Sequence, residues 1–360
     1  TLRVVLVVSS LFALVGHFLP RQVLAIYTND PAVIASGAEY LKLLSISFVL
    51  FSFSNCYIMC LRAVEQVRIS MVVYGCSFFI NVFFNYCFIF GKLGAPAWGV
   101  RGAAFGTVMA RLFELCATLV YMCFIEKRVC FTPRWLLQLK SGLGRDYVRN
   151  SVPVVSNELL WGVGLSVVNL TIGHMGASYT SAMSIVNVFN QLVSVFTFGM
   201  SAASAVVVGK TIGEGRIQDA KRAANSSVLV GLCLSLICMT LLLVGRPYIL
   251  SLYNVSQLAH ETAFAMMTIL ALMQPFQAVG CVMIGGVLRG GGDVRTNLML
   301  DSGLQWCLAI PLGLLTGFVL HWSAPVVFFF LRCDNIVKSI AGFIRLRSGK
   351  WIRVVNREST

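Results

Sequence analysis

The chain has 360 residues, of which 58% are hydrophobic and only 12% are charged, and its mean hydropathy is +0.82. So few polar residues could not cover the surface of a water-soluble fold, and lipid must therefore be the solvent for much of the molecule. The formal net charge of +14 at pH 7 would also fit a nucleic-acid partner, and the placement of the basic residues decides that question.

Apolar stretches recur along the whole chain. Crossing a bilayer as a helix takes roughly 20 mostly apolar residues. Segments of this kind are predicted at residues 2–19, 40–60, 70–90, 102–125, 152–173, 182–208, 226–245, 262–285, 298–317 and 323–344. The sequence therefore predicts an all-α polytopic membrane protein with about ten transmembrane helices.

The Lys and Arg residues are distributed unevenly between the predicted loops. With both chain ends in the cytoplasm, 20 of the 28 lie in cytoplasmic segments, and only Arg21, Lys92, Arg101 and Arg246 lie outside. This distribution obeys the positive-inside rule. Basic charge therefore sets the topology, and we expect a multi-pass protein of the plasma (inner) membrane, with both ends of this chain cytoplasmic and no nucleic-acid partner.

The chain contains an internal repeat. Leu61-Arg-Ala-Val-Glu-Gln-Val-Arg68 matches Leu288-Arg-Gly-Gly-Gly-Asp-Val-Arg295 at an offset of 227 residues, which indicates two copies of one multi-helix unit. An even number of helices per copy gives both copies the same orientation in the membrane. We therefore predict two pseudo-symmetric helical bundles that are related by an axis along the membrane normal.

The two copies differ in length. Residues 1–125 supply four helices, which correspond to the last four of the six in residues 151–345. Residues 126–150 are predicted to be a cytoplasmic inter-bundle linker, and residues 346–360 a basic cytoplasmic tail. We expect an N-terminally truncated chain from a parent of twelve helices, and we expect the fragment to be inactive by itself.

Glu158 is the main candidate for chemistry inside the membrane. An ionised group at the centre of a span costs about 2.5–3.5 kcal/mol and needs a partner, water or a function. At 100° per residue Asn169 falls on the same helix face, with Trp161 beside it. Glu158 is predicted to be the cation-coupling residue, with Asn157, Trp161 and Asn169 lining a cavity; the alternative is a carboxylate that pairs with a neighbouring helix.

Further polar residues are predicted to line the same kind of cavity. Ser184, Asn187, Gln191 and Ser194 recur at helical spacing, with Asn190 adjoining, and form a stripe that faces either a cavity or another helix. Asn81, Asn85 and Thr107 are the corresponding candidates in the first copy, and Asp301 and Gln305 are added in the second.

Several charged residues can be interpreted as members of ion pairs. Asp301 fits a structural ion pair with Arg295 or Arg289 as well as it fits a coupling role. Two further pairs, Arg111 with Glu114 and Asp334 with Lys338, have the helical spacing at which opposite charges neutralise each other.

These segments together resemble the multidrug and toxic compound extrusion (MATE) family of transporters. The resemblance is carried by Leu61-Arg-Ala with Arg68, by Ile80-Asn-Val-Phe-Phe-Asn85 and Ile89-Phe-Gly91, by Trp98-Gly-Val-Arg-Gly-Ala-Ala-Phe-Gly-Thr107, and by Val287-Leu-Arg-Gly-Gly-Gly-Asp293. It implies two six-helix bundles around a V-shaped central cavity. It also implies export of organic cations and other amphiphiles in exchange for Na⁺ or H⁺.

The resemblance also bears on single positions. Glu158 matches a family carboxylate in the first helix of the second bundle, about one turn closer to the preceding proline than in many members. Asn81 and Asn85 stand where members often have Asn and Asp, so the charge is lost at the second position. Thr107 matches a family threonine near that cluster.

We therefore expect a secondary antiporter that exports organic cations or other amphiphilic solutes by alternating access. The coupling ion is Na⁺ or H⁺ at Glu158, and no cofactor, other metal site or enzymatic activity is expected. The expected partners are a small-molecule solute and membrane lipid, and the protein is expected to be a monomer. The alternative is a lipid-linked oligosaccharide flippase of the same wider architecture, which would need several Arg or Lys residues in the cavity to hold pyrophosphate.

Overall fold

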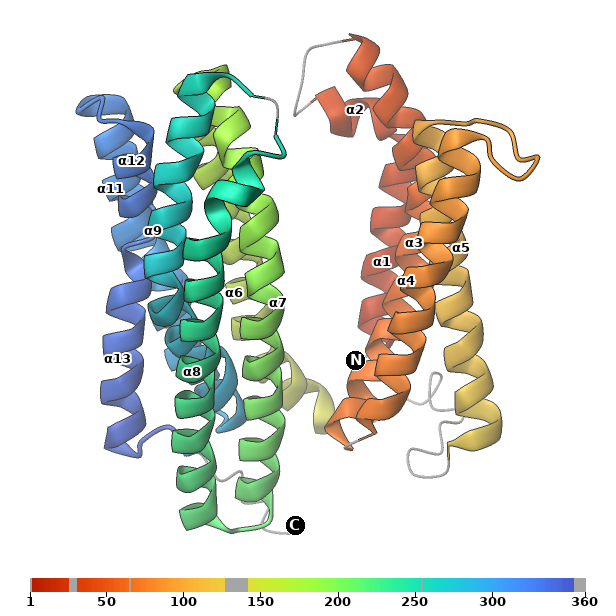
Figure 1. The fold of residues 1–360 in the computed structure, drawn as a ribbon. Coiled ribbons are helices and arrows are strands. Elements are labelled where there is room, and N and C mark those ends of the chain that lie inside the picture. The colour runs from red at the N-terminus through yellow and green to blue at the C-terminus, as the bar shows by residue number, and fades with distance from the viewer. Residues whose placement is uncertain (1, 26–30, 65, 127–141, 254, 353–360) are drawn as a thin grey trace. The chain divides into compact units, whose positions relative to one another are not determined.

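The computed structural model describes residues 2–25, 31–64, 66–126, 142–253 and 255–352, and every regular element in these ranges is a helix (Figure 1). The chain divides into two compact units, unit 1 (Thr1–Leu139) and unit 2 (Lys140–Thr360). Of the predicted linker, residues 127–141 lie outside the described residues, and helix α6 already begins at Gly142.

The described part of unit 1 is built from five α-helices. These are α1 (Leu2–Phe18), α2 (Pro20–Ala25), α3 (Pro31–Ala63), α4 (Val67–Phe90) and α5 (Val100–Val120), the last extended by a π-helical turn over Tyr121–Ile125. Helix α5 packs on α3 and α4. A side chain at Gly102 of α5 would overlap the backbone carbonyl of Phe88 in α4. Only glycine therefore allows these two backbones to approach so closely.

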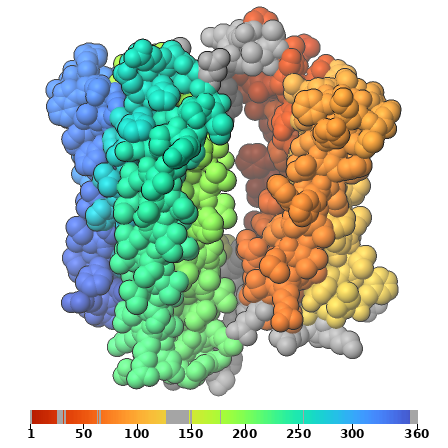
Figure 2. All heavy atoms as spheres, in the orientation of Figure 1, coloured from red at the N-terminus to blue at the C-terminus, as the bar shows by residue number. Residues whose placement is uncertain are grey.

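Unit 2 contains, in its described residues, eight α-helices joined in part by π-helical segments. They are α6 (Gly142–His174), α7 (Ala177–Gly213), α8 (Ile217–Leu250), α9 (Gln257–Cys281), α10 (Val294–Leu298), α11 (Ile310–Leu314), α12 (Ala324–Phe330) and α13 (Asp334–Ser348). A π-helical segment, Val282–Leu288, prolongs α9, and others connect α10 and α11 into one continuous rod over Val294–Val319. Figure 2 shows the outer faces of α8 in unit 2 and α4 in unit 1.

The membrane-spanning character predicted from the sequence is confirmed. Within the described residues, eight helices are long and apolar enough to cross a bilayer, and α1 is a shorter apolar helix. The last predicted span, 323–344, is divided at residues 331–333 into α12 and α13. The backbone there makes i→i+3 hydrogen bonds, from Arg332 N–H to the Phe329 carbonyl and from Asn335 N–H to the Arg332 carbonyl, and the segment carries the charged residues Arg332, Asp334 and Lys338.

The core of unit 2 consists of two apolar clusters. One includes Val186 of α7 and Leu270 of α9, and the other includes Val208 of α7 and Val287 beyond α9. Along both helices, buried polar residues fall between the two clusters, and Gln274 donates a hydrogen bond to Thr197 at 3.0 Å there. A polar layer therefore lies partway along helices that are otherwise apolar.

The polar layer depends on small residues that let backbones approach. A side chain at Gly286 would lie 2.9 Å from the Ser201 carbonyl, so α7 and the segment that prolongs α9 are in close contact there. The hydroxyl of Ser201 donates to the Cys281 carbonyl at 3.0 Å, beside a helix that changes to π geometry. Loosened backbone hydrogen bonding and a nearby serine occur together, as expected in a membrane interior, where each freed carbonyl needs a donor.

The two copies of the repeat have the same local backbone geometry. The Gln66 N–H donates to the Leu61 carbonyl at 2.9 Å, and the Asp293 N–H donates to the Leu288 carbonyl at the same distance. The backbone angles also agree, with φ −84° and ψ 64° at Gln66 and φ −87° and ψ 52° at Asp293. The repeat found in the sequence is therefore also present in the structure. In both copies the loop has the same backbone conformation where it leads into the next helix.

Part of the predicted C-terminal tail belongs to the fold. Trp351 is fully buried in the second apolar cluster, and its indole N–H donates to the Leu346 carbonyl at 3.0 Å. Arg345 pairs with the buried Asp293 at 2.6 Å, which fixes the end of α13 to the repeat loop. Residues 353–360 of the predicted tail lie outside the described residues.

The burial of Trp351 predicts a large effect on stability. Trp351→Ala should lower the free energy of unfolding by about 3–5 kcal/mol, because a large buried side chain leaves a cavity that the backbone cannot fill. Trp322→Ala, at an exposed position, is the matched control and should change it little. Thermal unfolding of the detergent-solubilised chain measures both, and equal melting temperatures for the two variants would contradict this account of Trp351.

Candidate functional site

Two adjoining cavities lie in the polar layer of unit 2. The first has a volume of about 380 Å³ and the second about 530 Å³. Trp161, Phe198, Gln277, Asn335 and Lys338 line both of them. Aromatic rings and polar groups therefore face the same space, and we refer to these spaces as the first and second cavity.

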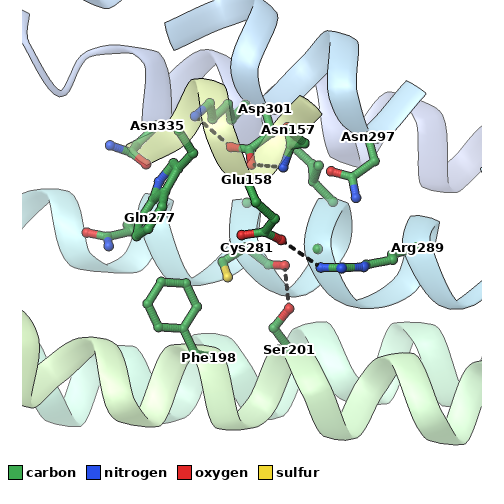
Figure 3. Close-up of a pocket in the computed structure, with 15 residues that line it drawn as sticks. Asn157, Glu158, Phe198, Ser201, Gln277, Cys281, Arg289, Asn297, Asp301 and Asn335 are labelled. Atoms are coloured by element: carbon green, nitrogen blue, oxygen red, sulfur yellow. Dashed lines mark hydrogen bonds and ion pairs between the residues drawn. The ribbon is translucent and has the colours of Figure 1, made fainter. Parts of the chain in front are cut away.

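Glu158 lines the first cavity and is paired with a cation. Its Oε1 lies 3.1 Å from Nη1 of Arg289, at the end of the π-helical segment that prolongs α9 (Figure 3). The side chains of Glu158 and Arg289 are 57% and 42% exposed. An exposed pair of this kind is weakly held, so the carboxylate can exchange partners at little cost. Its role in cation coupling stays a prediction.

Asn157, the neighbour of Glu158, joins two helices. It is buried, and its Nδ2 donates to Oδ2 of Asp301 at 3.0 Å (Figure 3). Its Oδ1 accepts a hydrogen bond of 2.7 Å from Ser302. Asn157 thereby fixes α6 to the rod that contains Asp301, and the sequence did not indicate this structural function.

Asp301, Asp334 and Lys338 form a cluster of charges, called the charge cluster below. The ammonium of Lys338 lies 2.8 Å from Oδ1 of Asp301 and 2.8 Å from Oδ2 of Asp334. The predicted pairing of Asp334 with Lys338 is confirmed. The predicted partners of Asp301, Arg295 or Arg289, are wrong, because helix packing brings Lys338 to this carboxylate instead.

The predicted stripe on α7 lines the second cavity. Asn187, Asn190, Gln191 and Ser194 all contribute, and Asn187 donates to Asn169 of α6 at 3.2 Å. Ser184 instead donates to the Thr180 carbonyl of its own helix. The members that line the cavity fit the first alternative, a stripe that faces a cavity. The bond from Asn187 to α6 fits the second, a stripe that faces another helix.

Two residues of the second cavity were not singled out from the sequence. Arg332 donates to Asn190 and to Gln277, each at 3.3 Å, and its guanidinium lies over the ring of Phe328. Both amides precede Arg332 by more than 50 residues in the sequence. Only their spatial proximity could have revealed the contact. Gln305, which was predicted, also lines this cavity, against Gly164 of α6.

The candidates in unit 1 lie together, Asn81 and Asn85 as their spacing predicts and Thr107 on the neighbouring helix as the resemblance implies. Asn85 donates to Asn81 at 3.0 Å, and Asn81 donates to Thr107 at 3.5 Å. The predicted pair of Arg111 and Glu114 is confirmed at 2.8 Å. Unit 1 therefore places an uncharged amide cluster and a self-neutralised ion pair on adjacent helices.

Comparison with protein-family models matches residues 1–87 and 153–315 of the chain to the family described as MatE. The chain belongs to the MatE family. Curated relatives include multidrug resistance protein MdtK of Yersinia enterocolitica, 29% identical over 265 residues, and MdtK of Yersinia pestis, 28% identical over 314 residues. These alignments cover 71% and 80% of this chain. The chain spans 56% and 66% of the length of these two relatives.

Solved structures share the fold. A MOP superfamily transporter from Pyrococcus furiosus superposes with a TM-score of 0.85 at 17% identity, over 96% of this chain and 76% of that protein. A mutant of the Vibrio cholerae MATE transporter VcmN gives 0.84 at 16% identity, over 96% and 77%. The MatE match includes Glu158 and Asp301 but ends at residue 315. Arg332, Asp334 and Lys338 thus lie beyond the matched range.

The pair of Glu158 with Arg289 and the ion pairs of Lys338 should differ in their contribution to stability. Arg289→Gln should cost less than about 1 kcal/mol, because both side chains of its pair with Glu158 are exposed on unit 2. Lys338→Met should cost about 3–5 kcal/mol, because it leaves two carboxylates unpaired in a largely buried site. Thermal unfolding in one detergent measures both, and an Arg289→Gln variant as unstable as Lys338→Met would contradict the assignment of burial.

Proposed function

We propose that this MatE chain is part of a secondary transporter that exports small amphiphilic solutes in exchange for Na⁺ or H⁺. The observation that carries the proposal is the pair of adjoining cavities in unit 2. Their volumes of about 380 and 530 Å³ are in the range of about 300–1,000 Å³ typical of sites for drug-sized molecules. A membrane helix bundle with such a polar space at mid-length has the architecture that transport requires.

The lining suggests the class of solute. Trp161 and Phe198 pack edge to face with ring centroids 6.1 Å apart, and they offer flat apolar surface to an aromatic solute. Asn187, Gln191 and Ser194 add hydrogen-bonding groups without charge. This combination favours amphiphiles that carry one polar or charged end.

The charges of the cavities favour an exporter over a flippase. Holding a pyrophosphate group takes several unpaired cations, whereas Arg289 and Lys338 each contact a carboxylate. Arg332 is directed to two amide oxygens. The cavities therefore lack, among the described residues, a group of cations free for pyrophosphate.

Coupling to an ion rests on differential affinity. A ligand shifts a conformational equilibrium only if it binds the two states unequally. Glu158, in an exposed and exchangeable pair, can bind a cation in one state and Arg289 in the other. Placement in the inner membrane with both chain ends cytoplasmic, and a monomeric state, complete the proposal.

Efflux measurements test the proposal. The full open reading frame that encodes this chain is expressed in bacteria that lack their own exporters, and ion-driven efflux of a cationic dye is followed by fluorescence. Glu158→Gln should reduce the efflux rate by about tenfold or more, because removing a carboxylate that binds the coupling cation removes the driving interaction. Undiminished efflux in this variant would refute the role of Glu158.

A control for this substitution is available in the loop between α7 and α8. Glu214 also pairs with an arginine, since Arg216 Nε donates to it at 2.9 Å and lowers the pKa of its carboxyl. Glu214→Gln removes the same chemical group outside the membrane-spanning segments. Efflux should remain at the unsubstituted rate, and absence of dye efflux from the unsubstituted protein would overturn the proposed function itself.

A further inference from the structure

We propose that Cys56 and Cys60 of α3 form a binding site for trivalent organic arsenic compounds, in which both sulfurs bond to one arsenic atom. The site lies in unit 1, so the proposal goes beyond the proposed function and does not depend on the cavities of unit 2. The argument rests on the spacing of the two thiols, on a pocket beside them and on the charge of the product.

The two thiols are neighbours on one face of α3. Of the 12 cysteines of the chain, Cys56 and Cys60 are the only two that are four residues apart in the sequence. Residues at this spacing in a helix have Cβ atoms about 5–6 Å apart, and the two thiols interact with each other. Both are free, and Cys60 is exposed whereas Cys56 is half-buried. A reagent can therefore reach two sulfurs at once.

The helix holds the two thiols too far apart for a disulfide but close enough for a bridging atom. A disulfide needs Cβ atoms about 3.5–4.5 Å apart, which is less than the helical spacing provides. An atom bonded to both sulfurs adds one further bond to the bridge, so it spans the longer distance without a change in the backbone. The pair is therefore suited to bind a thiophilic atom rather than to form a disulfide.

A pocket of about 380 Å³ lies beside the two thiols and is called the thiol pocket below. Its lining includes Cys56, Met59 and Cys60 of α3, together with Phe51 of the same helix and Val5 of α1. Met59 is three residues after Cys56 and so lies on the same helix face. An apolar cavity of about 150 Å³ is large enough to bind benzene. The thiol pocket therefore has room for an aryl group, and its ring and thioether surfaces suit one.

Trivalent arsenic fits the charge of the site better than a metal ion does. Among the described residues, no group of three or more His, Cys, Asp or Glu side chains could hold a metal ion. A soft monovalent ion such as Cu⁺ favours thiolates, but two thiolates would leave one net negative charge within the candidate span Ile34–Arg62. Charge is costly there. A trivalent arsenic atom that carries one aryl group forms two As–S bonds and remains neutral.

The reaction needs no oxidant or reductant. An arylarsenous acid, R–As(OH)₂, condenses with the two thiols to give R–As(S–Cys)₂ and two molecules of water. Two As–O and two S–H bonds break while two As–S and two O–H bonds form, and each thiol proton leaves with one hydroxyl group of the acid. Arsenic stays trivalent throughout. The second As–S bond forms within the complex, so the adduct should be held roughly 10²- to 10⁴-fold more tightly than by one thiol.

Binding is measured on the purified 360-residue chain in detergent, with phenylarsine oxide as the probe and intact-mass spectrometry as the readout. Excess 2-mercaptoethanol, a monothiol, should leave one arsenical bound per chain, whereas the dithiol dimercaptopropanol should remove it. Cys56→Ser and Cys60→Ser should each weaken retention against the monothiol roughly 10²- to 10⁴-fold. Cys76→Ser removes another exposed cysteine, on α4, and as the matched control should retain the adduct.

Ser52→Phe tests the thiol pocket while both thiols are kept. Ser52 lines this pocket one helical turn before Cys56. A ring at this position should weaken binding of phenylarsine oxide and leave binding of inorganic arsenite, which has no aryl group, unchanged. Peptide mapping of the unsubstituted chain is independent of any variant, and phenylarsine oxide should protect Cys56 and Cys60 together from alkylation. The site can therefore be tested even if a serine variant does not fold.

Three results would overturn the site. They are an unsubstituted chain that loses the arsenical to 2-mercaptoethanol, a Cys56→Ser variant that retains it, and protection from alkylation only at other cysteines. Equal weakening of phenylarsine oxide and arsenite binding by Ser52→Phe would refute the role of the pocket. A protein that retains the arsenical but exports no dye would keep this site and refute the proposed function, and the reverse result would refute only the site.

Discussion

The contact of Lys338 with two carboxylates at once constrains how unit 2 is assembled. An ammonium and two carboxylates placed in a largely apolar bundle are costly unless they meet, and they meet only if α13 and the rod that contains Asp301 are in register. Asn157 extends the constraint to α6 through its hydrogen bond to Asp301. Polar contacts that are short and directional therefore hold α6, α13 and the segment Val294–Val319 together. Apolar packing alone would not specify their relative rotation.

Contacts within one helix could be predicted from the spacing of residues, and contacts between helices could not, except where the family resemblance placed Thr107 near Asn81 and Asn85. Asn81 with Asn85, Arg111 with Glu114, and Asp334 with Lys338 are three or four residues apart, and helical periodicity places such residues on one face. Asp301 with Lys338, and Glu158 with Arg289, depend on packing between distant helices. Periodicity gives no information on which face of one helix meets which face of another. For this reason the sequence predicted the wrong ion-pair partners for Asp301.

Hydropathy predicted the spans well because it is a local property. Two of the ten predicted spans differ: α1 is a shorter apolar helix, and the last span is divided by a turn where its charged residues lie. The turn at residues 331–333 separates two helices and places Arg332 at the second cavity, with Asp334 and Lys338 directly after it. A regular apolar helix in this place would have provided a more typical membrane span but no charge cluster. The local departure from the membrane pattern thus coincides with the most polar part of the bundle.

Exchange of a solute for a cation requires that the two ligands influence each other through the same residues. This influence is reciprocal. If the cation lowers the affinity for the solute by some factor, the solute lowers the affinity for the cation by the same factor. Under the proposed function Lys338 would link the two ligands, because it lines both cavities and contacts both carboxylates of the charge cluster. The exposed pair of Glu158 and Arg289 can open at little cost, whereas Lys338 is buried between two carboxylates and its separation from them is costly. The site therefore combines one ion pair that can exchange its partner with a charge cluster that keeps its contacts.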